Sequence, residues 1–215
     1  NFLAFLGWNP GTEQEVFTLD ELCQAFSLDK VSKGGARFDF DKARWFNQQH
    51  ILRMDSRELA RRVRPWIEKH GPRPDEDYLV AFCELMKERV TLLPDFWTEG
   101  YYFFVPVRQY DEAAIKKRWQ PGRRPAMEGL IAALDNLSDW TADAIGQAIK
   151  QYLTDHNLKF GDVLPFVRLA LAGTMKGPGV NEMIALLGKE TTLQRLREGL
   201  DLFDRLVTAN VESAD

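Results

Sequence analysis

Residues 169–190, LALAGTMKGPGVNEMIALLGKE, contain two apolar runs separated by a turn rich in glycine. Apolar residues recur at helical spacing in both runs, and the runs stop at Gly173 and Gly188. Residues 177–179 read Gly-Pro-Gly, a sequence that lets a backbone turn sharply or approach another group closely. The stretch therefore predicts two helices joined by a tight, accessible loop, and it raises the question of what approaches that loop.

The same helical pattern extends over most of the chain. In residues 75–93, apolar side chains recur at the spacing of an amphipathic helix: Leu79, Phe82, Cys83, Met86 and Val90. Further amphipathic runs occupy residues 55–71, 125–137, 141–157, 162–173, 180–188 and 191–207. Strand signals are confined to the short stretches 36–40 and 101–107. We therefore expect an all-α fold, a helical bundle or superhelical cage with little or no β structure.

Helix starts carry recognisable capping residues. Thr18 and Glu21 have the spacing of a capping box, in which each side chain bonds the backbone of the other residue. Thr191 and Gln194 repeat that spacing, and Ser56 is the predicted N-cap of the helix in residues 55–71. Each of these helices is predicted to begin at its capping residue.

Composition favours an ordinary globular protein. Of the 215 residues, 45% are apolar and 28% are charged, and no run approaches the length of about 18 apolar residues that a membrane span needs. Two cysteines without metal-binding spacing indicate a reducing, cytoplasmic environment. The sequence starts at Asn1 without a methionine or a signal segment, and we expect it to be a fragment of a longer protein.

Basic residues are concentrated in one segment, although the whole chain has a net charge of -4. Residues 42–73 contain nine lysines and arginines against three acids, so this window carries +6 and the remaining residues carry -10. Such segregation is typical of a side that faces a polyanion, and it also fits a solvated helix surface whose arginines pair with nearby acids. Charge alone leaves both interpretations open.

Catalytic and metal-binding signatures are missing from the sequence. The histidines, His50, His70 and His156, stand far apart and belong to no metal-ligand motif. The glycine pair in residues 31–39 lacks the spacing of a phosphate-binding loop. We therefore expect no catalytic residue and no metal site in this chain.

The two ends of the chain resemble the part of bacterial glutamyl-tRNA synthetases that follows the catalytic domain. The N-terminal residues that match the family pattern, in order, are Asn1, Leu3, Leu6, Gly7, Trp8, Phe17, Thr18, Glu21, Val31, Ser32, Phe38, Asp39, Lys42, Trp45 and Asn47. Residues 168–190 resemble the C-terminal motif of the same family. The resemblance is specific because it combines order, spacing and rare tryptophan, glycine and asparagine positions.

The resemblance implies a tRNA-binding fragment without the catalytic domain. It implies the end of the stem-contact region in residues 1–52, two anticodon-binding helical subdomains in residues 53–107 and 108–207, and a tail in residues 208–215. The parent enzyme would use ATP and Mg²⁺ to attach glutamate to tRNA(Glu) in the cytoplasm, whereas this fragment would hold no cofactor and be inactive alone. Its partners would be tRNA(Glu) and the parent catalytic domain in cis, with no membrane, and it would be a monomer.

The resemblance also places residues against the anticodon. Arg89 would read the last anticodon base, cytosine in glutamate tRNAs and guanine in glutamine tRNAs. A guanidinium only donates hydrogen bonds, which suits the O2 and N3 acceptors of cytosine and not the donors of guanine. The first two bases would meet Arg168 and the loop residues Gly177, Pro178 and Val180. Members of the family often have threonine at the position of Gly177, so we expect backbone contacts at this loop.

One asparagine and five cations are further candidates for contact with the tRNA backbone, a kind of contact that adds affinity without sequence information. These candidates are Arg44, Asn47, Arg57, Arg61, Lys116 and Lys117. Trp119 lies in the basic run of residues 116–124 and could either stack a base or belong to the core. The alternative function is a helical protein-interaction scaffold with a basic face.

Overall fold

The computed structural model describes residues 1–212, so the last three residues of the predicted tail, 213–215, lie outside the described part. Two compact units divide the chain: unit 1 is Asn1–Glu99 and unit 2 is Gly100–Asp215. Both are helical, and the described residues contain no strand, only an isolated antiparallel bridge between Trp8 and Val31. The all-α prediction is confirmed. The subdomain boundaries predicted at residues 52 and 107 stay predictions.

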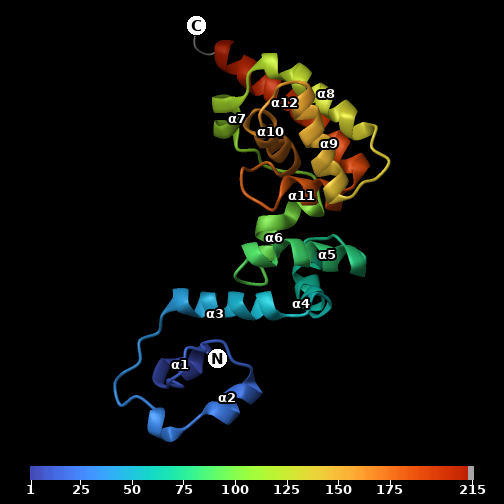
Figure 1. The fold of residues 1–215 in the computed structure, drawn as a ribbon. Helices are drawn as coiled ribbons and strands as arrows, with labels where there is room; N and C mark the ends of the chain where they lie inside the picture. Colours follow the sequence, from blue (N-terminus) through green and yellow to red (C-terminus); the bar gives the residue numbers. More distant parts are fainter. Residues whose placement is uncertain (213–215) are drawn as a thin grey trace. The chain divides into compact units, whose positions relative to one another are not determined.

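Unit 1 begins with a loop-rich segment and continues into longer helices (Figure 1). Its helices are α1 (Phe2–Gly7), α2 (Leu19–Ala25), the 3₁₀ turn η1 (Leu28–Lys30), α3 (Phe40–Arg53), α4 (Ser56–Glu68), α5 (Glu76–Met86) and the 3₁₀ turn η2 (Lys87–Arg89). The helix α6 (Asp95–Gly100) follows and ends at the first residue of unit 2. The predicted apolar face of α5 is confirmed, because Leu79, Phe82 and Met86 are fully buried.

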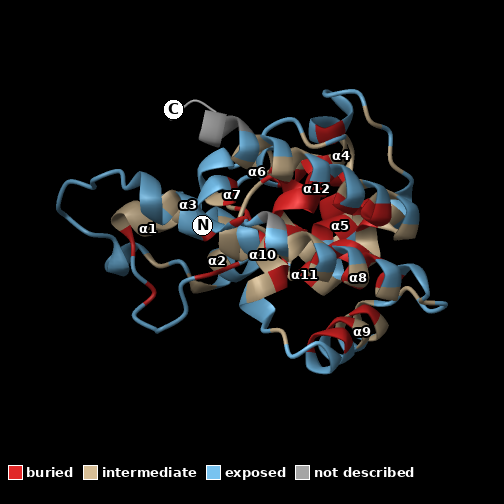
Figure 2. Cartoon of the chain, turned by 90° about the horizontal axis from the view of Figure 1, so that it is seen from above, coloured by how far each residue is buried: buried red, intermediate tan, exposed pale blue. Residues whose placement is uncertain are grey.

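Unit 2 is a bundle around its last helix. Its elements are η3 (Tyr101–Phe103), α7 (Glu112–Arg118), η4 (Pro121–Arg123), α8 (Arg124–Asp135), α9 (Ala142–Asp155), α10 (Phe160–Ala172), α11 (Val180–Leu187) and α12 (Lys189–Glu212). α12 contacts α7, α8, α10 and α11, and buried residues gather on it (Figure 2). At one crossing, a Cβ on Gly199 would lie 2.6 Å from the Cβ of Ala170. The missing side chain therefore allows α12 and α10 to approach closely.

The structure confirms one predicted helix start and corrects two. Thr18 and Glu21 form the predicted capping box at α2. At α4 the cap is Asp55, whose side chain accepts from the backbone N–H groups of the second and third helical residues, and Ser56 is the first helical residue. α12 already begins at Lys189, so the second predicted box at Thr191 lies inside the helix. The prediction of a capping box at Thr191 was wrong because α12 begins two residues earlier, directly after Gly188, which ends α11.

The two cysteines have opposite environments. Cys83 is completely buried on α5, whereas Cys23 is exposed on α2. Burial raises the pKa of the Cys83 thiol to about 12, with a smaller contribution from the neighbouring Glu84. The reactive thiolate is therefore scarce at Cys83 near neutral pH.

We expect a thiol-specific reagent to modify one cysteine per native chain near neutral pH and both after denaturation. The reason is that Cys23 is accessible, whereas Cys83 is both shielded and protonated. Mass spectrometry of the modified chain measures the count, and Cys23→Ser should abolish the native reaction. Rapid modification of both thiols in the folded chain would contradict the packing of α5.

Candidate nucleic-acid interface

The basic segment 42–73 divides into paired and unpaired side chains. Arg57 pairs with Glu76 and Asp77, and Arg61 and Arg62 share Glu58 at 2.7 and 2.8 Å. These pairs hold the pKa of Glu58 below its ordinary value, chiefly through the hydrogen bond from Arg62. The arginines on the first turns of α4 are thus largely engaged with neighbouring acids, as the solvated-surface interpretation requires.

Other cations in the same segment remain available. Among residues 1–212, the exposed side chains of Arg44, Lys69 and Arg73 form no ion pair or hydrogen bond within the chain. The solvated-surface interpretation therefore accounts for part of the basic segment, and the interpretation as a side that faces a polyanion stays a prediction. Among the cations of α3 and α4 that are predicted to contact the tRNA backbone, Arg44 is the one without an ion pair in the described chain. Arg57 and Arg61 would have to exchange their carboxylate partners for phosphates.

Arg89 is exposed at the end of η2, between two buried residues. Met86 and Val90 anchor the backbone on either side of it in the core of unit 1. Within the described part of the chain, the Arg89 side chain makes no ion pair and no hydrogen bond. The arginine therefore projects from a fixed backbone with its donors unused.

The acids close to Arg89 in sequence have other partners. Glu84 accepts from Lys87 at 2.7 Å and from Ser56, and these contacts lower its pKa. Asp95 accepts from the backbone N–H groups of Thr91 and Leu92 and from the Thr91 hydroxyl, at 2.8–3.0 Å. Neither carboxylate is therefore spare for Arg89, and the surface ion pair that would give this arginine a purely structural role is absent.

Asn47 ties α3 to the segment that follows Arg89. Its side-chain amide donates to the backbone carbonyl of Thr91. Asn47 therefore helps to position the backbone near Arg89. This structural role differs from the contact with tRNA that the sequence predicts for Asn47. The predicted contact itself stays a prediction.

The glycine turn between α10 and α11 contacts another segment of the same chain at its first glycine. Gly173 ends α10 in the left-handed conformation, with φ 74°. A Cβ there would collide with the carbonyl oxygen of Gln109, and the Gly173 carbonyl accepts from the N–H of Asp111 at 2.7 Å. The opening glycine of the turn therefore leaves room for the backbone of residues 107–111, which lies against it.

The second glycine of the turn stands beside two polar side chains. Gly177 has φ 133°, and a Cβ built on it would lie 2.9 Å from the hydroxyl oxygen of Tyr102 and 3.1 Å from Nη1 of Arg168. Arg168, on α10, is half-buried, with its Nη1 shielded from solvent. The structure thus brings Arg168 and Gly177 together, as the sequence predicts. Tyr102 is an additional member that sequence reasoning missed.

The remaining loop residues face inward. Pro178 and Val180 are buried, and Val180 begins α11. Any RNA contact here would use the backbone, as expected, together with the exposed side chain of Lys176. Lys176 was missed by sequence reasoning, although its position directly before Gly177 could have marked it.

Several residues of the basic run 116–124 have partners within the chain. Lys116 pairs with Glu112 at 2.9 Å, whereas Lys117 and Arg118 are exposed and without such partners in the described chain. Trp119 is buried, packs edge-on against Phe166 and Phe203, and donates its indole N–H to Asp204 at 2.7 Å. The core interpretation of Trp119 is therefore the right one.

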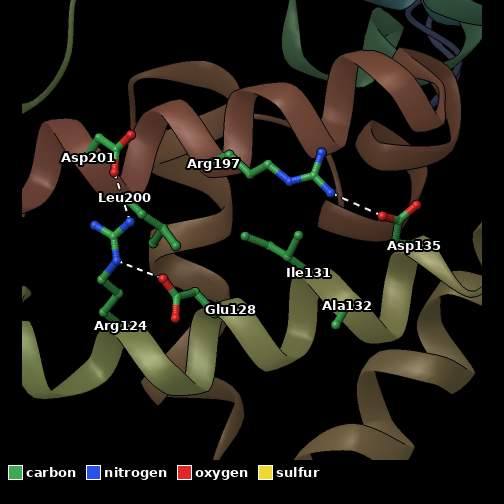
Figure 3. A pocket seen from close by; sticks show the side chains of 8 residues that line it. All are labelled: Arg124, Glu128, Ile131, Ala132, Asp135, Arg197, Leu200 and Asp201. Atoms are coloured by element: carbon green, nitrogen blue, oxygen red, sulfur yellow. Dashed lines mark hydrogen bonds and ion pairs between the residues drawn. The ribbon is translucent and has the colours of Figure 1, made fainter.

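Ion pairs close a groove between α8 and α12. Figure 3 shows Arg124 bonded to Glu128 and Asp201, and Arg197 bonded to Asp135 across a space of about 460 Å³. A further bond to Asp204, at 2.6 Å, contributes most to raising the pKa of Arg124. The charged side chains of this groove pair with each other, and their ion pairs join α8 to α12.

Among residues 1–212, no helix is long and apolar enough to cross a membrane. Nor does any group of three His, Cys, Asp or Glu side chains there have an arrangement suited to a metal ion.

Both units are all-α, and exposed cations without a partner in the described chain occur on unit 1 at Arg44 and Arg89 and on unit 2 at Lys117 and Arg118, which defines an all-α module suited to meeting a polyanion. The chain belongs to the anticodon-binding domain family, whose family model matches residues 58–200.

Known proteins similar to the chain are glutamate–tRNA ligases. Those of Porphyromonas gingivalis and Christiangramia forsetii are 37% and 38% identical over 94% of this chain. A crystal structure of the glutamate tRNA ligase from Elizabethkingia meningosepticum, in complex with its amino acid, matches with a TM-score of 0.87 at 33% identity over 93% of the chain. The chain covers 40% of each of these relatives.

Proposed function

We propose that this chain is the anticodon-reading part of a glutamate–tRNA ligase and that it binds tRNA(Glu). The observation that carries the proposal is the state of Arg89: exposed, held on a buried backbone, and without the carboxylate partners that sequence proximity offers. Membership of the anticodon-binding family and the likeness to glutamate–tRNA ligases support the choice of tRNA.

In this proposal the anticodon bases are read from two places. Arg89 donates to the O2 and N3 acceptors of the last base, cytosine. Arg168 and the backbone of residues 177–180 meet the first two bases, which single-stranded RNA loops present unstacked. The free cations Arg44, Lys69, Arg73, Lys117 and Arg118 are available for the phosphates.

The catalytic steps belong elsewhere in the parent enzyme. ATP and Mg²⁺ would be bound by a catalytic domain that acts in cis, and we propose that the parent is a monomeric cytoplasmic enzyme. This chain would supply affinity and selectivity for the tRNA and no chemistry.

Binding of anticodon stem-loops by residues 1–215 tests the proposal. We expect the loop with the glutamate anticodon to bind more tightly than one with the glutamine anticodon, at both low and high salt. Affinity should fall with salt for both loops because phosphate contacts release counterions, while their ratio should persist. Equal affinity for the two loops under both conditions would favour a scaffold and refute anticodon reading.

The chain alone should also give no aminoacylated tRNA. An assay with glutamate, ATP, Mg²⁺ and tRNA(Glu) is expected to yield product only when the full-length ligase of a relative is added as a positive control. Turnover by residues 1–215 alone would contradict the proposal, because it would mean that this chain itself catalyses the reaction.

A further inference from the structure

We propose that His70 and Trp97 form a stacking platform for an unpaired base of the anticodon loop, with Lys69 and Arg73 as cations for the adjoining phosphates. The inference deepens the proposed function and rests on it, because it assumes that unit 1 meets the loop of tRNA(Glu). It adds a base contact to those proposed for Arg89 and for the glycine turn.

The rings of His70 and Trp97 lie face to face. Their centroids are 4.2 Å apart and their planes are parallel, with an interplanar angle of 0°. Trp97 is half-buried, whereas His70 is exposed, so one face of the imidazole covers the indole and the other face is turned to solvent. Single-stranded RNA presents unstacked bases, and proteins bind them on aromatic faces, including that of histidine. A base on the outer face of His70 extends the stack from two rings to three.

Buried neighbours hold both rings in place. His70 follows the end of α4, and its N–H donates at 3.0 Å to the carbonyl of Ile67, which is fully buried. Trp97 lies on α6 directly after Phe96, which is fully buried as well. The platform is therefore ordered before any base arrives, and this limits the entropy that binding costs.

The charges next to the platform favour a polyanion. In the described part of the chain, the exposed side chains of Lys69 and Arg73 form no ion pair or hydrogen bond. Glu68, the acid next to Lys69, is engaged by Arg64 at 3.1 Å. Arg64 also donates to the carbonyl of Pro74 at 3.0 Å, which joins α4 to the loop that carries Arg73. Both cations thus stand free on a segment that is held in place.

Other acids close to the platform in sequence do not neutralise these cations. Asp75 accepts from the backbone N–H of Tyr78 at 2.7 Å and caps α5. Glu99 is exposed two residues after Trp97 on α6, and residues at that spacing do not face each other on a helix. A phosphate beside the stacked base is therefore attracted by Lys69 and Arg73.

The place of the platform in unit 1 indicates which base it takes. Arg89, proposed to read the last anticodon base, belongs to the same unit, whereas the glycine turn that is assigned to the first two bases belongs to unit 2. We therefore expect the base that follows the triplet along the loop to stack on His70.

The test is His70→Ala in the full chain of 215 residues, with anticodon stem-loops of tRNA(Glu) as probes. One stem-loop is intact, and in each of the others a different loop nucleotide lacks its base. We expect His70→Ala to weaken binding of the intact loop about five- to twentyfold, as the loss of a stacked base does. Removal of the base that follows the triplet should cost the unmodified chain a similar factor and cost His70→Ala nothing further.

His70→Phe is the matched control, because it keeps an aromatic face at this position and should retain the affinity. His156→Ala is a second control. His156 is also exposed and packs on an aromatic ring, that of Tyr152, but it lies in unit 2 and its Nδ1 is 2.9 Å from the Tyr152 carbonyl oxygen. It should leave the affinity for every loop unchanged. Thermal unfolding by circular dichroism verifies that each variant is folded.

Lys69→Gln tests the phosphate contact separately. It should weaken all the loops by one common factor and reduce the slope of affinity against salt by about one. Unchanged affinity and an unchanged slope would contradict a phosphate contact at Lys69.

The outcomes separate the inference from the proposed function. If His70→Ala binds the intact loop as before, or weakens the intact loop and every base-free loop by one factor, no base stacks on His70 and the inference is wrong. Anticodon reading still stands in that case, provided that the unmodified chain prefers the glutamate anticodon to the glutamine anticodon. If the unmodified chain shows no such preference, anticodon reading fails, whereas loss of the His70→Ala effect on removal of one loop base would still support the platform.

Discussion

Arg89→Gln is expected to reduce discrimination between cytosine and guanine at the last anticodon position by about 1–3 kcal/mol. The arginine has only donors, and it matches cytosine and opposes the N1–H and N2–H donors of guanine. A glutamine amide has both a donor and an acceptor, so it can pair with either base. Because Arg89 has no partner among residues 1–212, its loss should not leave a buried carboxylate uncompensated.

Competition binding with two stem-loops that differ only at that base measures the effect. Arg73→Gln is the control, since Arg73 is likewise exposed and unpaired in unit 1. It should preserve the affinity ratio of the two loops, whether or not it lowers both affinities through a lost phosphate contact. If Arg89→Gln instead weakens both loops by the same factor, Arg89 contacts the backbone and the base assignment is wrong.

The local part of the fold could be predicted from the sequence because helical periodicity and caps are encoded within a few residues. The buried face of α5 and the capping box at Thr18 follow from such short patterns. The two helix starts that were predicted wrongly, at Ser56 and Thr191, also have local causes. Asp55 and Ser56 are both good N-caps and stand side by side, and the connection from α11 to α12 is shorter than the capping residues indicate.

The site required information that short patterns do not contain. The pairing of Arg57 with Glu76 depends on how α4 meets α5, so charge counting alone could not separate paired from free arginines. The approach of Tyr102 to Gly177 joins residues 75 positions apart and depends on the packing of unit 2. Resemblance to a family singled out Arg89 and Arg168, whereas the exposure of Arg89 and the residues that surround Arg168 became visible only in three dimensions.

The other large effect is expected from Gly173→Ala, which should lower the free energy of unfolding by about 2–4 kcal/mol. Gly173 has φ 74°, where a Cβ is strained. The new methyl group would also collide with a backbone atom, the carbonyl oxygen of Gln109, which cannot rotate away as a side chain can. Relief requires the segment 107–111 to shift, and that shift would stretch the hydrogen bond from the Asp111 N–H to the Gly173 carbonyl.

Gly161→Ala on the same helix separates this effect from a general response to substitution. Gly161 lies in the first turn of α10 with φ outside the left-handed region, and a Cβ there would meet no atom within 4 Å. That variant should be unchanged or more stable by about 0.5 kcal/mol, because alanine restricts the unfolded chain. Urea unfolding followed by circular dichroism gives both values. Equal effects of the two substitutions would mean that segment 107–111 does not press on Gly173. A large loss at Gly173 alone would show that the first glycine of the turn is needed for the fold.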